Sequence, residues 1–301
     1  MRTATTTSTT AARVALATAA GAIDLDDDAP PLIAALAGRG IASRLCVWDD
    51  ATVDWAAWDL VVLRSTWDYP RRYDAFVRWV TDVAAATRVC NPPEVVTWNS
   101  DKRYLLELAG CGVGIVPSAV YGPGSPVKLP DDGRFVVKPT VSAGAQDTVR
   151  YDRTGHADAL AHTRRIQSQG RHVLVQPYVE HVDDRGETAL VFMGGRFSHA
   201  IRKGPILTGA PETVGGLFAA EDIRPRTPTD HERAAAELAL DALPFDRTDL
   251  LYARVDLLPG PDGTPLLLEV ELVEPSLFLR FCDGAPDRLA RSIAAHLDRY
   301  A

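Results

Sequence analysis

The chain has 301 residues, of which 46% are hydrophobic and 24% are charged, and its formal net charge is −8. This length exceeds one typical hydrophobic core, so we expect a globular protein of two or three domains. The acidic balance argues against a general nucleic-acid binder and against binding to anionic membranes. The four cysteines, Cys46, Cys90, Cys111 and Cys282, are scattered without zinc-site spacing, which favours reduced thiols in a cytoplasmic protein.

The first third of the chain alternates predicted strands with predicted helices. We read residues 1–12 as a tail, and no apolar run approaches the ~20 residues of a membrane span. The pattern then predicts strands at Val14–Thr18, Ile41–Trp48 and Leu60–Leu63, and helices at Pro31–Ala37 and Tyr73–Ala86. Such alternation is typical of a small α/β unit with a parallel sheet.

The remainder mixes strands and helices less regularly. A helix is expected to begin at Asn99, Ser100 or Asp101 and to end at Gly110. The stretch Gly204–Gly216 is rich in glycine and proline. The other expected elements are strands at Phe135–Lys138, His172–Gln176, Thr188–Met193 and Arg196–Arg202 and helices at Ala157–Gln167, Thr229–Ala242 and Ala285–Leu297.

A charged hairpin near the C-terminus is the most informative feature. Two strands, 252–258 and 266–272, flank a turn, and we expect Leu258 to pair with Pro265. Side chains alternate between faces, so Arg254 then lies opposite Glu269, with Asp256 diagonal to it and Glu271 on the same face. One arginine cannot neutralise three carboxylates. The hairpin therefore predicts a divalent cation, and oxygen ligands beside phosphates suit Mg²⁺.

Two lysines are candidates for contact with phosphate. Lys138 ends an apolar strand and precedes Pro139, so its stem can be buried while its ammonium group reaches the sheet margin. The loop that follows contains Ser142, Ala143 and Gly144, whose small side chains let backbone N–H groups approach an anion. Lys102 lies in the first turn of the predicted helix. It either reaches a phosphate group or is a solvated lysine at the surface.

Two further segments follow strands. The run Gln176, Pro177, Tyr178, Val179, Glu180 is either an ordinary strand exit or a hinge that meets an adenine edge, with Glu180 or Glu187 near the ribose. The run Arg64, Ser65, Thr66, Trp67 follows a buried strand, where ligand sites of parallel sheets lie. Arg64 could bind a carboxylate; a packed tryptophan in a structured turn is the alternative.

In this order, these pieces resemble the ATP-grasp superfamily of carboxylate–amine ligases from about Asn99 to Ser276. The string Ala253-Arg254-Val255-Asp256 is especially similar to D-alanine–D-alanine ligases, whereas Glu271 stands where those relatives have asparagine. The resemblance implies an ATP-grasp fold, α/β (α+β overall), with an N-terminal α/β domain over residues 1–98. A central lid domain would then cover 99–179, and a C-terminal domain with the Mg²⁺ site would cover 180–301.

The resemblance also implies roles for the residues. Lys102 and Lys138 would contact ATP phosphates, and the loop 142–146 would close over them. Asp256, Glu269 and Glu271 would hold Mg²⁺. Arg254 would steady the transferred phosphoryl group or the acyl intermediate. We assign Arg202 and Lys203 to the substrate carboxylate or acylphosphate, with a basic strand end in water as the alternative.

Within the superfamily, the strings Arg64 to Tyr69 and Ile201 to Pro205 look like the O-ureido-D-serine cyclo-ligases, which close the ring of D-cycloserine. That implies a small amino-acid-like substrate and an antibiotic-biosynthesis role. An intermolecular amino-acid ligase, a small-molecule kinase and a non-catalytic nucleotide-binding protein are the rival hypotheses. The sequence does not fix the oligomeric state, and a homodimer is left open.

Overall fold

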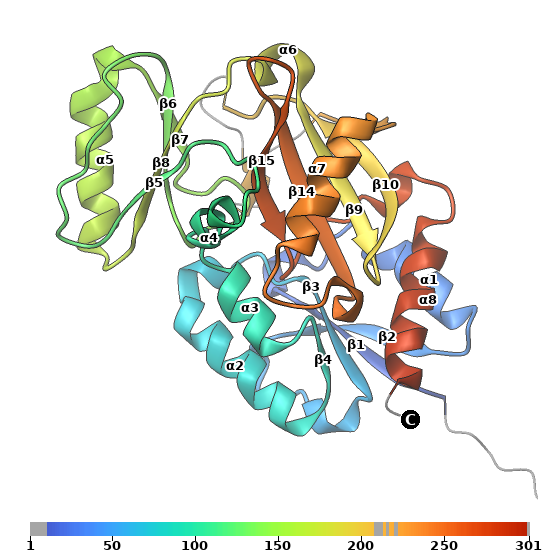
Figure 1. The fold of residues 1–301 in the computed structure, drawn as a ribbon. Coiled ribbons are helices and arrows are strands. Elements are labelled where there is room, and N and C mark those ends of the chain that lie inside the picture. The colour runs from blue at the N-terminus through green and yellow to red at the C-terminus, as the bar shows by residue number, and fades with distance from the viewer. Residues whose placement is uncertain (1–10, 208–212, 215–216, 220–221, 300–301) are drawn as a thin grey trace, which may run out of the picture.

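The computed structural model describes residues 11–207, 213–214, 217–219 and 222–299. Within these residues the strands form three larger sheets and a two-stranded ribbon, and each larger sheet comes from its own stretch of chain (Figure 1). The predicted tail over residues 1–12 and the stretch Gly204–Gly216 lie partly outside the described residues.

The N-terminal sheet has the strand order β2-β1-β3-β4, and every pair is parallel, as the sequence predicts. Its central strands are continuous apolar runs because helices cover both of their faces. Proline stands in the first turn of two of the helices, where its missing N–H costs nothing. The elements are β1 (Arg13–Thr18), α1 (Ala29–Ala37), β2 (Ala42–Val47), β3 (Leu60–Ser65), α2 (Tyr73–Ala86), β4 (Val89–Cys90) and α3 (Pro93–Asn99).

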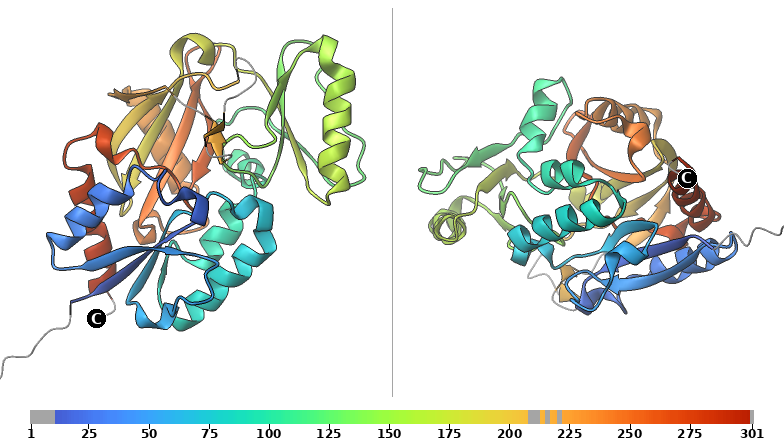
Figure 2. Two further views of the ribbon diagram at one scale, coloured as in Figure 1. Left: turned by 180° about the vertical axis from the view of Figure 1, so that it is seen from behind. Right: turned by 90° about the horizontal axis from the view of Figure 1, so that it is seen from below.

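The central sheet is antiparallel, has the order β5-β8-β6-β7, and stands out from the other two with one helix on its face (Figure 2). Its two outer strands are absent from the sequence-based prediction because they are three residues long and largely exposed. The elements are α4 (Tyr104–Gly110), β5 (Ala119–Tyr121), β6 (Phe135–Pro139), β7 (Val149–Tyr151), α5 (His156–Ser168) and β8 (Val173–Pro177).

The C-terminal sheet is antiparallel with the order β13-β10-β9-β14-β15. Its covering helix α7 begins with a capping box between Thr229 and Glu232. The elements are α6 (Val182–Arg185), β9 (Glu187–Met193), β10 (Arg196–Lys203), β13 (Ile223–Arg226), α7 (Asp230–Asp241), β14 (Tyr252–Pro259), β15 (Pro265–Glu271) and α8 (Ala285–Asp298), and the ribbon consists of β11 (Thr213–Val214) and β12 (Phe218–Ala219).

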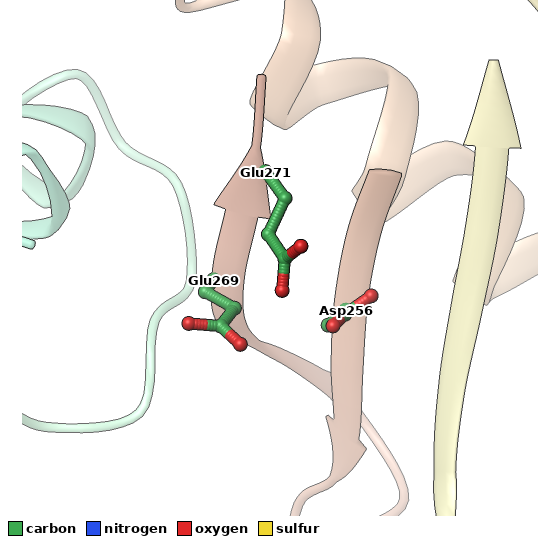
Figure 3. Close-up of side chains that lie close together, drawn as sticks. All are labelled: Asp256, Glu269 and Glu271. Atoms are coloured by element: carbon green, nitrogen blue, oxygen red, sulfur yellow. The ribbon is translucent and has the colours of Figure 1, made fainter. Parts of the chain in front are cut away.

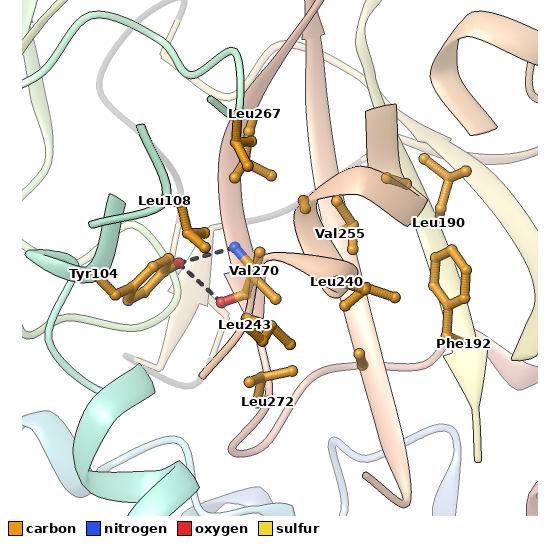
Figure 4. Packing of buried hydrophobic residues seen from close by; sticks show 14 of the residues in the cluster. Tyr104, Leu108, Leu190, Phe192, Leu240, Leu243, Val255, Leu267, Val270 and Leu272 are labelled. Carbon is orange, nitrogen blue, oxygen red and sulfur yellow. Dashed lines mark hydrogen bonds between the residues drawn. The ribbon is translucent and has the colours of Figure 1, made fainter. Parts of the chain in front are cut away.

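Side chains provide hydrogen-bond partners for backbone groups along the outer edge of β15. The Tyr104 hydroxyl donates to the carbonyl of Val270 at 2.9 Å and accepts from its N–H at 2.8 Å (Figure 4). Asn99 also donates to the Val270 carbonyl, at 2.8 Å, and accepts from the N–H of Leu272 at 2.7 Å. Unpaired strand edges are costly to bury, so these bonds fix the junction against β15.

This junction corrects one prediction. The expected helix from Asn99, Ser100 or Asp101 to Gly110 is two helices, α3 and α4, with Lys102 in the turn between them. Asn99 ends α3 rather than capping a new helix, because its amide is committed to β15.

Helix α8 joins the N-terminal and C-terminal sheets. Its apolar residues, such as Leu289 and Ile293, share one core cluster with Leu32 of α1, Leu16 of β1 and Val191 of β9, and Figures 1 and 2 show α8 running beside α1. The two sheets therefore pack as one unit around this helix. Over the described residues, we find no helix with the length and apolarity that a bilayer crossing requires.

Candidate active site

A cavity of about 350 Å³ is lined by residues of the central and C-terminal sheets and by loops of the N-terminal part of the chain. One part of its lining is apolar and another is charged. The apolar part contains Val116, Val136, Tyr178, Val179, Val182, Leu258 and Leu268. A narrow apolar slot of this kind suits a flat aromatic base.

The strand exit after β8 enters this slot. Gln176, Tyr178 and Val179 line the cavity, as the sequence predicts, and the Gln176 amide donates to the Ser118 hydroxyl at 2.9 Å. Glu180 does not line it. Its carboxylate is exposed and pairs with Arg134, so Glu187, buried in the cavity wall, is the only one of the two predicted ribose acids near the site.

The three carboxylates predicted to hold a metal do converge. Asp256 projects from β14, and Glu269 and Glu271 project from β15 toward it (Figure 3). Each offers an oxygen atom within 4.8 Å of the others.

The predicted register of this hairpin is wrong. Asp256 pairs with Glu269 and Arg254 pairs with Glu271. The turn aligns Pro259 instead of Leu258 with Pro265, which shifts the pairing by one residue, and a β-bulge that leaves Leu268 without a partner on β14 shifts it by one more. The extra residue shifts the alternation, so that Leu268 and Glu269 both line the cavity. The three acids therefore face each other more directly than the predicted register allows.

The acids have more cationic partners than the sequence suggests. Arg254 forms ion pairs with Asp256 at 2.9 Å and with Glu271, and Lys203 contacts Asp256 at 2.7 Å. Lys203 also pairs with Glu187, and Lys102 lies 3.4 Å from Glu269. These cations balance much of the acidic charge without a metal ion, but the gathered oxygens remain a suitable donor set for Mg²⁺.

The protonation of the acids follows from burial and these partners. Burial raises the pKa of Asp256, but Arg254 and Lys203 outweigh it and hold that pKa below its usual value. Burial also raises the pKa of Glu269, but the positive charges of Lys102 and Lys138 outweigh it and lower that pKa to about 2. At Glu271 burial dominates over Arg254 and raises the pKa to about 7.

Lys138 and Lys102 lie where an anion can be held. Lys138 is buried in the cavity wall on β6, and among the described residues its ammonium group has no ion-pair partner. Burial lowers its pKa to about 8. Lys102 donates to the Ser142 carbonyl at 2.8 Å, which ties it to the small-residue loop and excludes the solvated-lysine interpretation.

The small-residue loop lines the same cavity. Ser142, Ala143 and Gly144 are part of its wall. Gly144 has φ of 60° and Ala145 has φ of 59°, a left-handed turn in which a larger side chain at 144 is disfavoured. Gln146 then accepts from Arg71 at 3.3 Å and donates to the Leu217 carbonyl at 2.8 Å. This loop thus contacts both the N-terminal unit and the segment after β10.

The structure does not bring Arg64, Ser65 and Thr66 to the cavity, although Trp67 lines it. Arg64 is fully buried. Its charge is compensated there, because the guanidinium group lies 3.3 Å from Asp28 and donates to the Pro275 carbonyl at 3.2 Å. The Ser65 hydroxyl bonds to Thr18. These residues support the cavity wall from behind.

Arg202 also lies outside the cavity lining, whereas Lys203 is part of it. The Arg202 guanidinium group donates to the carbonyls of Arg185 and Asp184, at the end of α6. Neighbouring residues of a strand point to opposite faces, so only one of the two can reach the site.

Sequence analysis missed several residues of the cavity. Tyr69, Glu274 and Phe278 line it, and Trp67 donates its indole N–H to the Glu274 carbonyl at 3.1 Å. The sequence signal for Glu274 is weak, because it follows Glu271 by three residues and so breaks the two-residue spacing of Glu269 and Glu271.

Comparisons with known proteins agree with this site. A family model described as the N-terminal domain of the D-cycloserine synthetase DcsG matches residues 14–91. The cycloserine biosynthesis protein DcsG of Streptomyces lavendulae is 39% identical over 297 residues, which cover 94% of this chain and 98% of that protein.

Solved structures give the fold. A crystal structure of D-cycloserine synthetase DcsG matches with a TM-score of 0.85 at 36% identity and covers 95% of this chain and 99% of that one. The ATP-grasp ligase PsnB, complexed with minimal precursor, Mg and ADP, matches with a TM-score of 0.58 at 17% identity, over 95% of this chain and 98% of that one. The expected family and fold are confirmed: the chain belongs to the DcsG family of D-cycloserine synthetases and has the ATP-grasp fold.

Proposed function

We propose that this chain is an ATP-dependent cyclo-ligase that converts O-ureido-D-serine to D-cycloserine, with release of ADP, phosphate, CO2 and NH3. The observation that carries the proposal is one cavity in which three lysines, a buried arginine and three converging carboxylates adjoin an apolar slot. Membership of the DcsG family supports the choice of substrate.

The nucleotide is held by three parts of the cavity. Its base occupies the apolar slot beside Tyr178 and Val179, and Glu187 lies toward the ribose. Its phosphates lie between Lys138, Lys102 and the loop 142–144. Lys102 then exchanges its contact with Glu269 for a phosphate oxygen, which leaves that carboxylate free for another cation.

Asp256, Glu269 and Glu271 would hold Mg²⁺, because their oxygens converge. The ion would supply positive charge against the phosphates. The negative charge of Glu269 at neutral pH follows from its low pKa and suits this task. Glu271 needs the ion to become fully ionised, because burial raises its pKa to about 7.

The chemistry has two displacements and a hydrolysis. A substrate carboxylate oxygen attacks the terminal phosphorus atom and ADP leaves, which gives an acylphosphate. The ureido nitrogen bonded to oxygen then attacks the acyl carbon and loses its proton, and phosphate leaves as the ring closes. Water finally cleaves the bond between the ring nitrogen and the carbamoyl carbon, and the carbamoyl group is released as CO2 and NH3. Arg254, anchored by Asp256 at 2.9 Å, is placed to stabilise the negative charge that develops on the phosphoryl oxygens.

A turnover assay with a single organic substrate tests the proposal. Purified protein is given O-ureido-D-serine, ATP and Mg²⁺ without a second amine, and ADP, phosphate and D-cycloserine are measured. Equal amounts of the three products support cyclisation. ADP that appears only with an added amine indicates an intermolecular ligase, and a stable phosphorylated product indicates a kinase. Nucleotide binding without any ADP release contradicts the enzymatic proposal.

A further inference from the structure

Glu274 differs from every other acid in the charged part of the cavity. It follows Glu271 by three residues, is 8% exposed and lines the cavity. Its backbone carbonyl is fixed by the indole N–H of Trp67. Among the described residues, however, its carboxyl group has neither a hydrogen bond nor an ion pair.

The other buried acids are all matched by a cation. Asp256 has Lys203 and Arg254, Glu271 has Arg254, and Glu187 has Lys203. Asp26 and Asp27 also line the cavity, but Arg64 lies 3.7 Å from Asp26 and Arg280 pairs with Asp27. Glu274 is therefore a buried carboxyl group left for a partner that the chain does not supply.

An unmatched buried carboxylate is costly, so a ligand that brings a cation gains affinity by pairing with it. Burial, and then the negative charge of Glu271, raise the pKa of Glu274 to about 8. The group is consequently held mostly neutral until a positive charge arrives. A bound cation reverses this and draws the carboxyl group into its ionised form.

The surroundings fit an organic cation better than a metal ion. Trp67, Tyr69 and Phe278 line the same cavity, and aromatic faces attract ammonium groups. The Glu274 carboxyl group is close enough to Tyr69 to perturb the pKa of its phenol. The oxygens that gather as a potential metal site belong to Asp256, Glu269 and Glu271, without Glu274.

We propose that Glu274 is the receptor for the α-ammonium group of an amino-acid substrate, an inference that rests on the proposed function. The substrate carboxyl group must lie by Arg254, because it is phosphorylated there. Arg254 and Lys102 are the cations whose charges act on Glu274. An α-amino acid carries its ammonium group one carbon away from its carboxyl group, so a receptor beside the phosphorylation site has the required placement.

The test compares O-ureido-D-serine with its desamino analogue in the wild type and in Glu274→Gln. The wild type should prefer the amino substrate by about 10- to 100-fold in kcat/KM, the size of a charge-assisted hydrogen bond. Glu274→Gln should lose this preference while its KM for ATP stays unchanged. Glu237→Gln, an exposed substitution on α7, is the matched control and should keep the preference.

Three outcomes overturn the inference. The first is a Glu274→Gln variant that keeps the wild-type preference for the amino substrate, and the second is a wild type without such a preference. The third is a variant that needs more Mg²⁺ than the wild type, which makes Glu274 a metal ligand. A wild type that does not turn over O-ureido-D-serine contradicts the proposed function instead. Calorimetry with a non-hydrolysable ATP analogue, Mg²⁺ and D-serine against D-glycerate then tests the receptor by binding alone. Selective binding of the amino acid that is lost in Glu274→Gln supports it, and equal binding of the two overturns it.

Discussion

Arg64 and Asp28 form a buried ion pair, 3.3 Å between Nη2 and Oδ2, in which Asp28 is part of the cavity wall and Arg64 lies behind it. Asp28 also accepts the N–H groups of Leu277, Phe278 and Leu279 at 2.6, 3.0 and 2.7 Å. Phe278 has φ of 51°, a left-handed conformation that is unfavourable for a phenylalanine. The pair therefore holds a strained loop against the cavity.

Arg64→Ala should lower the free energy of unfolding by about 3–5 kcal/mol, because it leaves Asp28 with an unmatched buried charge. Urea denaturation measures this loss. Arg72→Ala removes an exposed arginine that pairs with Asp49 and Asp68 and should cost less than about 1 kcal/mol. A stable Arg64→Ala protein with a raised KM for the carboxylate substrate would return Arg64 to the substrate site.

Lys138→Ala should weaken ATP binding, because it removes the unpaired ammonium group of the cavity. In the wild type, burial lowers the pKa of Lys138 to about 8, so the free protein loses this positive charge as the pH rises through 8. ATP affinity should therefore fall above pH 8. Lys138→Arg stays charged and should lack this decline. Calorimetric titration from pH 7 to 9.5 measures both effects, and identical pH profiles would exclude the role of Lys138.

Glu269→Gln should reduce kcat on the order of 100-fold, the size expected when one group that stabilises the transferred charge is lost. The fold should survive, because the substitution conserves the size of the side chain, although Lys102 and Lys138 lose a favourable charge partner. Circular dichroism and ADP release as a function of Mg²⁺ concentration are the measurements. A variant with the Mg²⁺ dependence and rate of the wild type would remove Glu269 from the metal site.

Glu274→Gln should stabilise the protein more strongly as the pH rises. In the unfolded chain this carboxyl group has its ordinary pKa of 4.5, and in the folded protein burial and Glu271 raise the pKa to about 8. The folded protein binds this proton more tightly than the unfolded chain does. The protonated group therefore contributes its full stabilisation below pH 4.5, and that stabilisation is lost as the pH rises through 8. The stability gained by the variant should grow by about 1.4 kcal/mol per pH unit within that window. Urea denaturation from pH 5.5 to 8.5 measures the free energy of unfolding of both proteins. A difference between them that stays the same at every pH would contradict the raised pKa.

Local patterns were sufficient to predict that these charged residues lie together in one cavity. Lys138 ends an apolar strand, and Asp256 and Glu269 lie on strands that alternate in polarity, so the neighbours of each residue indicate the face from which its side chain projects. The parallel N-terminal sheet was predictable for the same reason, because its buried strands are continuous apolar runs.

Errors arose where a distant residue decides the outcome. Arg64 follows a strand as a substrate residue would, but Asp28, from another part of the chain, binds its guanidinium group. Asn99 has the sequence of a helix cap, yet its amide is used by β15, more than 170 residues away. The hairpin register failed at the turn, where Pro259 pairs with Pro265, and again at Leu268, because alternation by itself reveals neither the exact turn nor a bulge.

That bulge decides which side chains of β15 reach the cavity. With regular alternation through all of its residues, the face that carries Leu266 and Leu268 would continue with Val270, and both glutamates would turn into the hydrophobic core. One surplus residue lets a single strand serve the base with its first half and the cation with its second. Removing Leu268, the surplus residue, should therefore leave both glutamates facing the cavity, because Leu267 and Glu269 would then alternate regularly. Removing Val270, beyond the bulge, should instead turn Glu271 away from the cavity.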